Sequence, residues 1–477
     1  MQNPEDHLKT IKQMQTIRLA AKAVAGITSA ILLLPSCAVE KEKLKPNIIV
    51  FLADDLGYGD LACYNDKGFH TPAVESIANQ GVRFTEFYSN GAESTPTRTA
   101  LLTGRYQQRV GGLECAIGTG NVGRYDDAIK LRETNDLGLP VSETSIAQLL
   151  KRAGYNTAIC GKWHLGYEDK FSPNLHGFDY VFYALGGGMD YFHHRENTGP
   201  EYLDVLIING KPVTMPGYFT DLIGNEALNF IDKQDGKTPF FLYVPFTAPH
   251  APYQGPEDYL SEPLPDTSYL WNQSKGPKHT YQAMIRSMDE NIGKILDKLE
   301  EKQITGNTLI VFMSDNGGTT SGDNGPLRGF KGNLFEGGIR VPCVVKWPGK
   351  IASGIVSDQP CMTMDISASI ARVAGASIPE NRKFDGIDIL KYIEKDQPAG
   401  ERTLFWRARR GEQTRKAVRK GEMKYIRLDN AGKIEEYLFD LGSDLSETAN
   451  LLSSFPDVVI RMRELIDDWE KEVEPTR

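Results

Sequence analysis

The chain has 477 residues, of which 40% are hydrophobic and 25% charged, with 46 Gly, 26 Pro and only 6 Cys. This composition excludes a disulfide-stapled miniprotein, a collagen-like fibre and a disordered tail. Lys and Arg total 54 against 63 Asp and Glu, and the formal charge of -9 argues against a protein that binds nucleic acid.

The N-terminal segment has the pattern of a secretion signal. Basic residues precede a mostly apolar run over residues 23–34, which is too short to span a bilayer as a helix. The sequence that follows, Leu34-Pro35-Ser36-Cys37, resembles a bacterial lipobox, in which the Cys becomes the lipidated first residue. We therefore expect a lipoprotein signal peptide at 1–36, a linker at 37–45, and export to the periplasm or the outer membrane. Lipidated Cys37 would be the only membrane anchor.

From Pro46 onward, short β-branched or aromatic runs alternate with longer amphipathic segments. This pattern predicts an α/β fold in which helices connect the strands of a largely parallel sheet. The expected strands cover residues 47–53, 155–160, 240–244, 308–313 and 341–347. The expected helices cover residues 71–80, 143–153, 281–300 and 364–374.

The C-terminal part of the chain has a different pattern. Residues 377–382 and the charged, Pro- and Gly-containing residues 394–402 indicate the edge of the main domain. We expect a short antiparallel strand pair and an amphipathic closing helix beyond them, at residues 417–428, 434–441 and 456–472. The predicted boundaries are 46–390 for the main domain and 391–477 for a smaller α+β subdomain.

Polar side chains follow two of the expected strands. Asp54 and Asp55 come after residues 47–53, and Asp315 and Asn316 come after residues 308–313. In a parallel sheet such strand ends lie along one edge, where open α/β sheets bind ligands. Crowded carboxylates repel one another unless a cation joins them, and hard oxygen ligands suit Ca²⁺ or Mg²⁺. The alternative is that polar residues simply terminate strands. Their occurrence at the carboxyl ends of two strands together favours a metal site.

The segment from Ser94 to Arg105 reads STPTRTALLTGR. A Pro in the first turn and Gly104 at the end predict a helix, whose start would favour an anion near Ser94. A simple Ser N-cap is the alternative, and that role needs no Arg98. The motif S-x-P-x-R followed by L-x-T-G-R resembles the sulfatase signature, whose first residue, Cys or Ser, is oxidised to formylglycine. Ser94 is the matching position, and the serine type depends on an anaerobic sulfatase-maturing enzyme.

The resemblance to sulfatases extends from about Pro46 to the C-terminus. Further motifs follow in the expected order, GKWHLG at 161–166, PHAP at 249–252, LRGFKG at 327–332 and FEGG at 335–338. The resemblance implies an alkaline-phosphatase-like catalytic domain at 46–390, with a large mixed sheet flanked by helices, and a C-terminal subdomain with a short antiparallel sheet. It also implies one Ca²⁺ held by Asp54, Asp55, Asp315, Asn316 and an oxygen of formylglycine 94.

A reaction follows from the same resemblance. One hydroxyl of the hydrated formylglycine attacks sulfur while the metal neutralises developing charge. Arg98 would orient this diol, and Lys162 and Lys331 would bind the sulfate oxygens. His250 would protonate the leaving alcohol oxygen, and His164 would take the proton from the second hydroxyl, so that aldehyde and sulfate are released.

Four residues are expected to contact the substrate. Residues 186–194 read GGGMDYFHH and occupy the place where family members have a loop over the pocket, so that Asp190, His193 and His194 could hydrogen-bond sugar hydroxyls. A flexible surface loop is the alternative. Glu93 would either face a sugar hydroxyl or pair with a neighbouring Arg. The loop resembles those of sulfatases acting on galactose or N-acetylgalactosamine, so a sulfate ester of either sugar in mucin or glycosaminoglycan is the expected substrate.

Two other functions remain as alternatives to a formylglycine-dependent carbohydrate sulfatase. A phosphatase or phosphodiesterase of the related alkaline phosphatase superfamily would use Ser94 directly, but such enzymes usually hold two metal ions and the sequence shows one oxygen cluster. A lipid-anchored glycan-binding protein predicts the loss of Arg98, His250 or Lys331, and all three are present. The basic run of Arg407, Arg409, Arg410, Arg415 and Lys416 could suggest a contact with a polyanion, but such runs usually form a solvated face, which is the interpretation adopted.

Overall fold

The structure is a computed structural model that describes residues 44–197, 202–398 and 400–475. The expected signal peptide and Cys37 lie outside the described residues. The contacts divide the chain after Leu44, and Lys45–Arg477 forms one unit. Within the described ranges, no helix is both long and apolar enough to cross a membrane.

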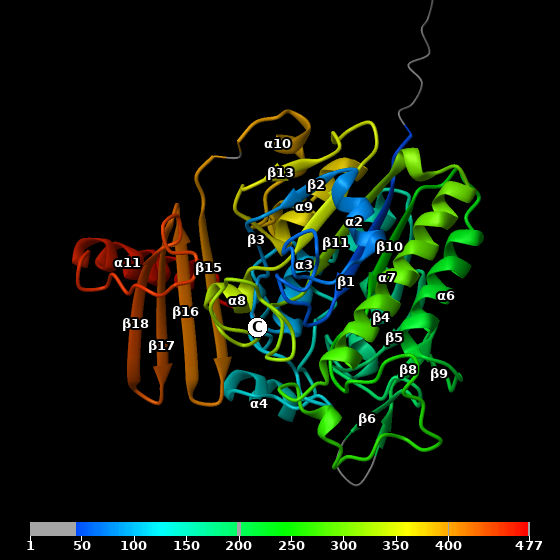
Figure 1. Ribbon diagram of the computed structural model, residues 1–477, viewed down its shortest axis with the longest axis horizontal. Helices are drawn as coiled ribbons and strands as arrows, with labels where there is room; N and C mark the ends of the chain where they lie inside the picture. The colour runs from blue at the N-terminus through cyan, green and yellow to red at the C-terminus, as the bar shows by residue number, and fades with distance from the viewer. Residues whose placement is uncertain (1–43, 198–201, 399, 476–477) are drawn as a thin grey trace, which may run out of the picture. The chain divides into compact units, whose positions relative to one another are not determined.

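A mixed sheet forms the centre of this unit (Figure 1), and its ten strands among the described residues have the order β13-β2-β12-β11-β1-β10-β4-β5-β8-β9. Five neighbouring strands run parallel, namely β11 (Thr308–Ser314), β1 (Asn47–Ala53), β10 (Phe240–Pro245), β4 (Asn156–Lys162) and β5 (Tyr180–Ala184). Antiparallel neighbours flank them on both sides, where β12 pairs with β11 and β8 pairs with β5. The outer strands are β13 (Ile355–Ser357), β2 (Val82–Phe84), β12 (Cys343–Lys346), β8 (Leu206–Ile208) and β9 (Lys211–Pro212).

The five strands expected from the sequence are all present, with bounds within two residues of the predicted ones. The expectation of a largely parallel sheet is wrong at one of them, because β12 runs antiparallel to β11. Strand direction depends on the connection between strands, and local alternation of residue types does not record it. The mixed α/β sheet flanked by helices that the family resemblance implied is confirmed.

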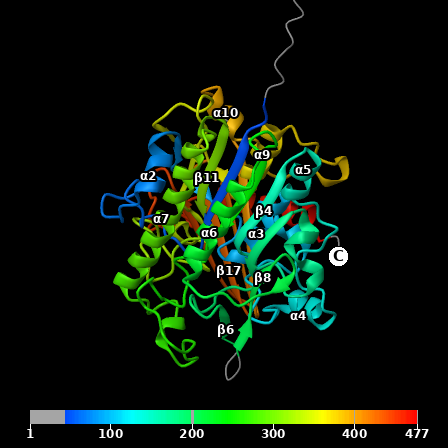
Figure 2. The same ribbon diagram turned by 90° about the vertical axis from the view of Figure 1, so that its right-hand side faces the viewer.

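Helices cover both faces of the sheet (Figure 2). Successive side chains of β1 point to opposite faces, so Ile48 and Val50 pack in one buried cluster and Ile49 and Phe51 in another. The first cluster includes residues of α3 (Ser94–Thr103), α5 (Ile146–Arg152) and α9 (Thr363–Ala374). The second includes residues of α2 (Pro72–Asn79), α6 (Phe219–Asp232) and α7 (Lys278–Glu301). A strand buried on both faces reads as a continuous apolar run, as NIIVFLA does.

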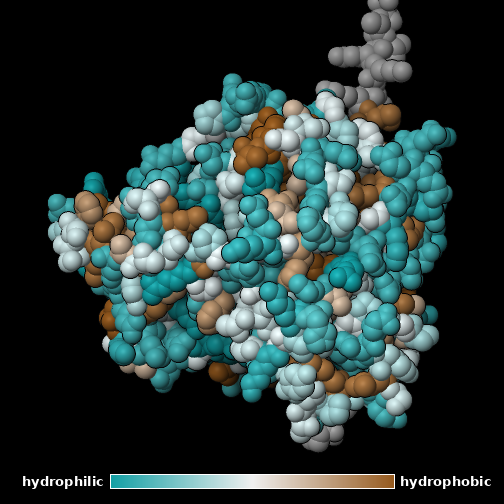
Figure 3. All heavy atoms as spheres, viewed as in Figure 1, coloured by the Kyte–Doolittle hydropathy of each residue, from teal (hydrophilic) through white to brown (hydrophobic). Residues whose placement is uncertain are grey.

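Shorter elements complete this part of the chain. The remaining α-helices of this part are α4 (Asp126–Glu133), α8 (Glu336–Ile339) and α10 (Leu390–Glu394), and one of several short 3-10 helices, η4, spans Tyr269–Trp271. Two small sheets pair β3 (Phe87–Tyr88) with β14 (Cys361–Met362), and β6 (Arg195–Asn197) with β7 (Tyr202–Asp204). On the face shown in Figure 3, hydrophilic residues cover most of the surface and hydrophobic ones form small groups.

The C-terminal region is a four-stranded antiparallel sheet with one long helix. Its elements are β15 (Thr403–Arg410), β16 (Gln413–Lys420), β17 (Met423–Asn430), β18 (Lys433–Asp440) and α11 (Pro456–Glu472). The bounds of α11 agree with the predicted ones. The predicted strand at 417–428 is wrong, because it contains a two-residue turn at Gly421 (φ +57°) that separates β16 from β17. Apolar and polar residues alternate in a similar way before and after the turn, so the sequence pattern did not reveal where one strand ends and the next begins.

The C-terminal sheet is buried on both faces. Val418 and Tyr425 pack against Met462 and Ile466 of α11. On the opposite face, Ala417, Ile426 and Phe439 share a buried cluster with Tyr88 of β3 and Ala100 of α3. The second contact joins this sheet to the helix that begins at Ser94.

Candidate active site

Polar side chains from two adjacent strands meet at one edge of the sheet. Ala53 of β1 pairs with Ser314 of β11, so the residues that follow them, Asp54, Asp55, Asp315 and Asn316, lie together. All four are at most 1% exposed. The backbone N–H of Asp55 donates to Asp315 Oδ1 at 3.3 Å, and Asn316 Nδ2 donates to Asp55 Oδ1 at 2.8 Å.

Three basic side chains enter the same cluster. Arg98 donates through Nε and a terminal nitrogen to Asp315 Oδ2 at 3.1 and 2.8 Å. Lys162, the last residue of β4, pairs with Asp54, and Lys331 pairs with Asp55 at 2.9 Å. Three carboxyl groups therefore face three basic side chains within the buried cluster.

Ser94 lies at the centre of this arrangement as the first residue of α3. The helix ends at Gly104, which adopts φ +67°, and both predicted ends of the helix are confirmed. The N-cap residue is Glu93, so the alternative in which Ser94 serves as a simple N-cap is wrong. Ser94 Oγ instead donates to Asp54 Oδ1 at 3.0 Å and lies 3.4 Å from Lys162 Nζ.

Burial and neighbouring charges set the protonation of the cluster. Burial would raise the pKa of Asp54, but Lys162, His250 and Arg98 outweigh it and hold that pKa below its usual value. In the same way Lys331 outweighs burial at Asp55 and lowers its pKa. Both groups are therefore carboxylates at neutral pH, which is the form that binds a metal ion.

Two histidines lie beside the carboxylates. His250 Nε2 is 3.6 Å from Asp55 and 3.0 Å from Gln273 Nε2, while its Nδ1 contacts the carbonyl oxygen of Ala251 at 2.5 Å. His164 Nε2 lies 2.9 Å from the carbonyl oxygen of Ile117. Burial and then Lys331 lower the pKa of His250, and burial and then Lys162 lower the pKa of His164, so both rings are neutral at pH 7.

The cluster fits a hard divalent cation. Asn316 Oδ1 is buried and has no hydrogen-bond partner among the described residues. Asp54, Asp55 and His250 offer ligand atoms within 4.8 Å of one another. Carboxylate and amide oxygens are ligands that Ca²⁺ accepts. The sequence-predicted set of Asp54, Asp55, Asp315 and Asn316 converges on this place, with Ser94 Oγ next to it.

A pocket of about 340 Å³ opens above Ser94 and is lined by Ser94, His164, His250 and Lys331 together with Glu93, Ala116, Ile117, Thr119, Arg124, Gly187, Gly188, Asn197, Ala251, Trp271, Gln273 and Arg410. The loop 186–188 approaches the histidines closely. A Cβ added to Gly187 would lie 2.9 Å from His164 Nε2, and one added to Gly188 would lie 2.7 Å from the carbonyl oxygen of Ala251. Close approach, rather than flexibility, explains why these positions are glycine.

The structure places three predicted substrate residues outside this pocket. Asp190 is fully buried and accepts backbone N–H groups of Phe192, His193 and Leu264. Nε2 of His193 and of His194 contacts the carbonyl oxygens of Leu260 and Gly217, at 3.0 and 3.1 Å. These side chains organise their own loop. The fourth, Glu93, does line the pocket, and it pairs with Arg410 at 3.0 Å.

The interpretation of residues 407–416 as a solvated face is wrong. Arg407 and Arg409 both pair with the buried Glu114, at 2.7 and 2.9 Å. Arg415 donates to the carbonyl oxygen of Gly332, the residue after Lys331. Carboxylates and carbonyl groups from distant parts of the chain face this basic run, and one of its members, Arg410 at the end of β15, lines the pocket.

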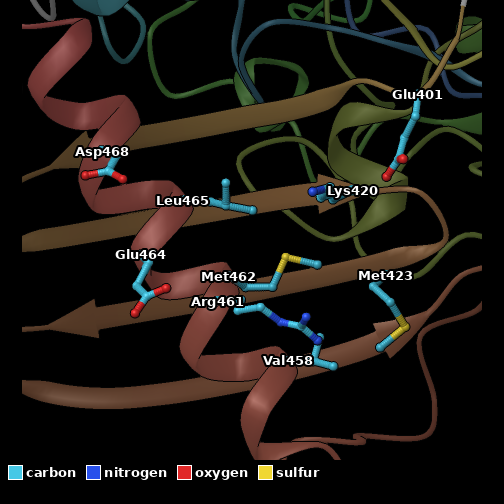
Figure 4. Close-up of a pocket in the computed structure, with 9 residues that line it drawn as sticks. All are labelled: Glu401, Lys420, Met423, Val458, Arg461, Met462, Glu464, Leu465 and Asp468. Atoms are coloured by element: carbon cyan, nitrogen blue, oxygen red, sulfur yellow. The ribbon is translucent and has the colours of Figure 1, made fainter.

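Sequence reasoning missed Arg124, Asn197, Trp271 and Gln273, because no local motif marks them. They lie on loops or at a strand or 3-10 helix end, and only the fold brings them to one pocket. A larger cavity of about 480 Å³ lies between α11 and the C-terminal sheet (Figure 4), lined among others by Met423, Met462 and Leu465. It contains none of the predicted site residues.

Comparison with known proteins identifies the family. The sulfatase model matches residues 46–376, and the model described as N-sulphoglucosamine sulphohydrolase, C-terminal, matches residues 330–472. The N-acetylgalactosamine-6-sulfatase of Mus musculus is 33% identical over 406 residues, which are 81% of this chain and 73% of the relative. The enzyme of that name from Homo sapiens is 34% identical over 362 residues, or 72% of this chain and 65% of the relative.

A solved structure agrees with this assignment. The crystal structure of Ps i-CgsB in complex with k-i-k-neocarrahexaose has a TM-score of 0.76 and 31% identity, covering 89% of this chain and 93% of that one. The sulfatase motifs lie within the residues matched by the first family model, and the C-terminal sheet lies within those matched by the second. The chain belongs to the sulfatase family and is a sulfuric ester hydrolase.

Proposed function

We propose that this sulfatase hydrolyses sulfate esters of glycans, with Ca²⁺ and with formylglycine made from Ser94. The observation that carries the proposal is the position of Ser94 Oγ, between Asp54 and Lys162 at the base of a pocket lined by His164, His250 and Lys331. A side chain at the start of a helix, beside a cluster of carboxylates, is suited to a nucleophile assisted by a cation. The proposed metal ligands are Asp54, Asp55, Asp315, Asn316 and residue 94.

Formylglycine would supply a hydrated aldehyde as nucleophile, and Ca²⁺ would neutralise developing charge. Side chains of the protein would bind the sulfate and orient the nucleophile. Lys162 and Lys331 direct their ammonium groups toward the carboxylates next to Ser94, where they would bind sulfate oxygens. Arg98 would orient the diol at position 94, and the support is that it is fully buried and holds the neighbouring Asp315 with two hydrogen bonds.

The two histidines have complementary proton roles. Nδ1 of His250 contacts the Ala251 carbonyl, so Nε2 is the ring nitrogen available to the substrate. The ring is neutral in the free protein, so Nε2 would first gain a proton when the anionic sulfate binds and would then give it to the leaving oxygen. His164 contacts the Ile117 carbonyl through Nε2, which leaves Nδ1 as a buried acceptor with no partner among the described residues. The lowered pKa of His164 keeps this ring neutral and able to accept a proton.

The proposed sugar is galactose or N-acetylgalactosamine, in mucin or glycosaminoglycan. The support is the 33% identity to proteins named N-acetylgalactosamine-6-sulfatase. Glu93 would contact a sugar hydroxyl, and its position in the pocket lining directly before Ser94 supports this role. Asp190, His193 and His194 would act only indirectly, by shaping the loop that carries Gly187 and Gly188.

Maturation and location belong to the same proposal. A serine-type anaerobic maturase would oxidise Ser94, and the exported chain would be anchored through lipidated Cys37 in the periplasm or the outer membrane. The support for export is the signal and lipobox pattern of the sequence. Radiolabelled fatty acid should enter the wild-type protein in its native host and should not enter a Cys37→Ala variant.

The first experiment is mass spectrometry of the peptide that contains Ser94, from active protein made in its native host. A mass lower by two hydrogens supports formylglycine, whereas unmodified Ser in fully active protein contradicts it. A panel of sulfated galactose, N-acetylgalactosamine and N-acetylglucosamine isomers then tests the sugar and the sulfated position. Turnover of matched phosphate esters alone would instead favour a phosphatase that uses Ser94 directly.

A further inference from the structure

Positive charge gathers on one wall of the pocket, away from the carboxylate cluster. Arg124 and Arg410 both line the pocket, although 286 positions separate them in the chain (410 minus 124). The backbone N–H of Gly411 donates to the carbonyl oxygen of Arg124 at 2.6 Å, so the β15–β16 turn is fixed to the segment that carries Arg124. A Cβ on Gly118 would lie 3.3 Å from a terminal nitrogen of Arg124, so this side chain lies beside the segment that carries Ile117 and Thr119 of the pocket lining.

Arg124 and Arg410 both act electrostatically on the buried thiol of Cys115. Burial and Glu93 raise the pKa of Cys115 to about 12, and Arg410 and Arg124 act on the same thiol in the opposite direction. Burial lowers the pKa of Arg415, on the next strand, and Glu93 opposes this shift whereas Arg410 adds to it. Of these arginines, Arg124 and Arg410 line the pocket, and Arg410 pairs with Glu93.

These three arginines exceed the negative charge near them. Glu93 pairs with Arg410, and the same Glu93 oxygen also accepts the backbone N–H of Ala116 at 2.8 Å. Arg415 donates to the Gly332 carbonyl and to Gln413, not to a carboxylate. Arg124 is exposed and has no ion pair with a carboxylate in the part of the chain that the structure describes.

A structural role explains two other arginines of β15, whereas Arg410 shares a single carboxylate, Glu93, and Arg124 forms no ion pair with a carboxylate among the described residues. Arg407 pairs with Glu114 and Glu470, and Arg409 pairs with Glu114 and Asp127. Both are supplied with carboxylates, as arginines that stabilise a fold usually are. In a chain with a net charge of -9, an excess of cationic groups at a pocket rim indicates an anionic ligand.

We infer that the pocket takes a second anionic group of the substrate in addition to the sulfate that is cleaved. Arg124 and Arg410 bind this group, which is a carboxylate or a second sulfate ester on the same or a neighbouring sugar. Both chemistries fit the planar fork of a guanidinium, which binds two oxygens at once. The inference rests on the proposed glycan sulfatase function and narrows its substrate class to glycans that carry at least two negative charges.

The test compares three disaccharides with the same scissile sulfate. The first has a neutral neighbouring sugar, the second a uronic acid, and the third a second sulfate ester. For matured wild-type enzyme we expect kcat/KM to be about fivefold higher for one or both doubly charged substrates, the change that an exposed charge pair produces. Preference for the second substrate identifies a carboxylate, and preference for the third identifies a sulfate. Equal kcat/KM for all three overturns the inference.

Variants then test whether Arg124 and Arg410 cause this substrate preference. Arg124→Gln should reduce the ratio of doubly to singly charged kcat/KM to near one, and Arg410→Lys should reduce it partly, since Lys keeps the charge but loses the fork. The matched control is Arg461→Gln, because Arg461 is also exposed and lies on α11. The preference should weaken as salt increases. A preference that Arg124→Gln retains overturns the assignment.

Binding measurements separate this inference from the proposed function. Protein that retains unmodified Ser94 can be titrated with the same three disaccharides by calorimetry in the presence of Ca²⁺, with no turnover. Tighter binding of the doubly charged glycans, lost in Arg124→Gln, supports the anion site even if no glycan sulfate is ever cleaved. Cleavage of all three without any difference in Kd supports the sulfatase function and overturns the anion site.

Discussion

Lys424 donates a hydrogen bond to Glu336 at 2.7 Å, and both side chains are fully buried. Lys424 belongs to β17, whereas Glu336 opens α8, five residues after Lys331. Glu447 accepts from Lys424 at 2.9 Å and from the backbone N–H of Glu336 at 2.7 Å. Burial would raise the pKa of Glu336, but Lys424 and Arg340 outweigh it and lower the pKa to about 2. The C-terminal sheet therefore holds the segment that follows Lys331.

Replacing this lysine should destabilise the protein strongly. Lys424→Met leaves Glu336 and Glu447 buried without their shared cation, a change that costs about 3–5 kcal/mol. We expect the free energy of unfolding in urea to fall by this amount. Lys420→Met, at an exposed lysine of the neighbouring strand, is the matched control and should change it by less than about 0.5 kcal/mol. Equal stability of the two variants would contradict the role of the buried cluster.

The glycine before Lys162 should tolerate no side chain. Gly161 has φ +140°, and a Cβ there would lie 2.0 Å from the carbonyl oxygen of Pro245 in the neighbouring strand. Gly161→Ala should therefore move β4 and with it Lys162, which lowers kcat/KM and costs about 1–3 kcal/mol of stability. Gly306→Ala, where a Cβ meets nothing within 4 Å, is the control. Thermal unfolding and turnover of both variants check the expectation, which fails if they behave alike.

A buried imidazole should make stability depend on pH. Burial lowers the pKa of His176 from 6.5 to about 4. Between these values the unfolded chain binds a proton that the native state does not, so the contribution is fully present above pH 6.5 and is lost as the pH falls towards 4. From this residue we expect the free energy of unfolding to fall by about 1 kcal/mol between about pH 7.5 and 5.5.

The variant His176→Gln isolates this effect, because the amide does not titrate. Its unfolding free energy should fall less steeply over the same pH interval than that of the wild-type protein. The control is His70→Gln, since the His70 side chain is 87% exposed. Identical pH slopes for His176→Gln and wild type would show that His176 is not the group responsible.

Removal of the proposed metal should lower both stability and turnover. A chelator is expected to abolish hydrolysis and to lower the thermal unfolding temperature, and added Ca²⁺ should restore both. At a Ca²⁺ concentration 100-fold above Kd the ion would contribute about 2.7 kcal/mol to stability. Asn316→Ala should weaken Ca²⁺ binding in calorimetry because it removes a buried amide oxygen, whereas Asn229→Ala, at an exposed amide, should not. Unchanged Ca²⁺ affinity in Asn316→Ala would remove Asn316 from the ligand set.

The sequence by itself was sufficient for features that depend on neighbouring residues. The apolar run of β1 and the polar residues after β1 and β11 identified two buried strands and the edge where they meet. The ends of α3 were predictable because Pro96 and Gly104 act locally on the backbone. Family membership followed from motifs of this kind.

Only the tertiary structure decided which side chains form the rest of the pocket. Glu93 and Arg410 are 317 positions apart, and their ion pair exists because the C-terminal sheet packs against α3. His193 and His194 resemble substrate ligands in the sequence, yet their rings contact backbone carbonyls of nearby loops. Local patterns record backbone preferences and burial, whereas the partner of a charged side chain depends on contacts between distant segments. The acidic net charge was therefore known from composition, but only the fold showed that Arg124 and Arg410 lie together at one pocket.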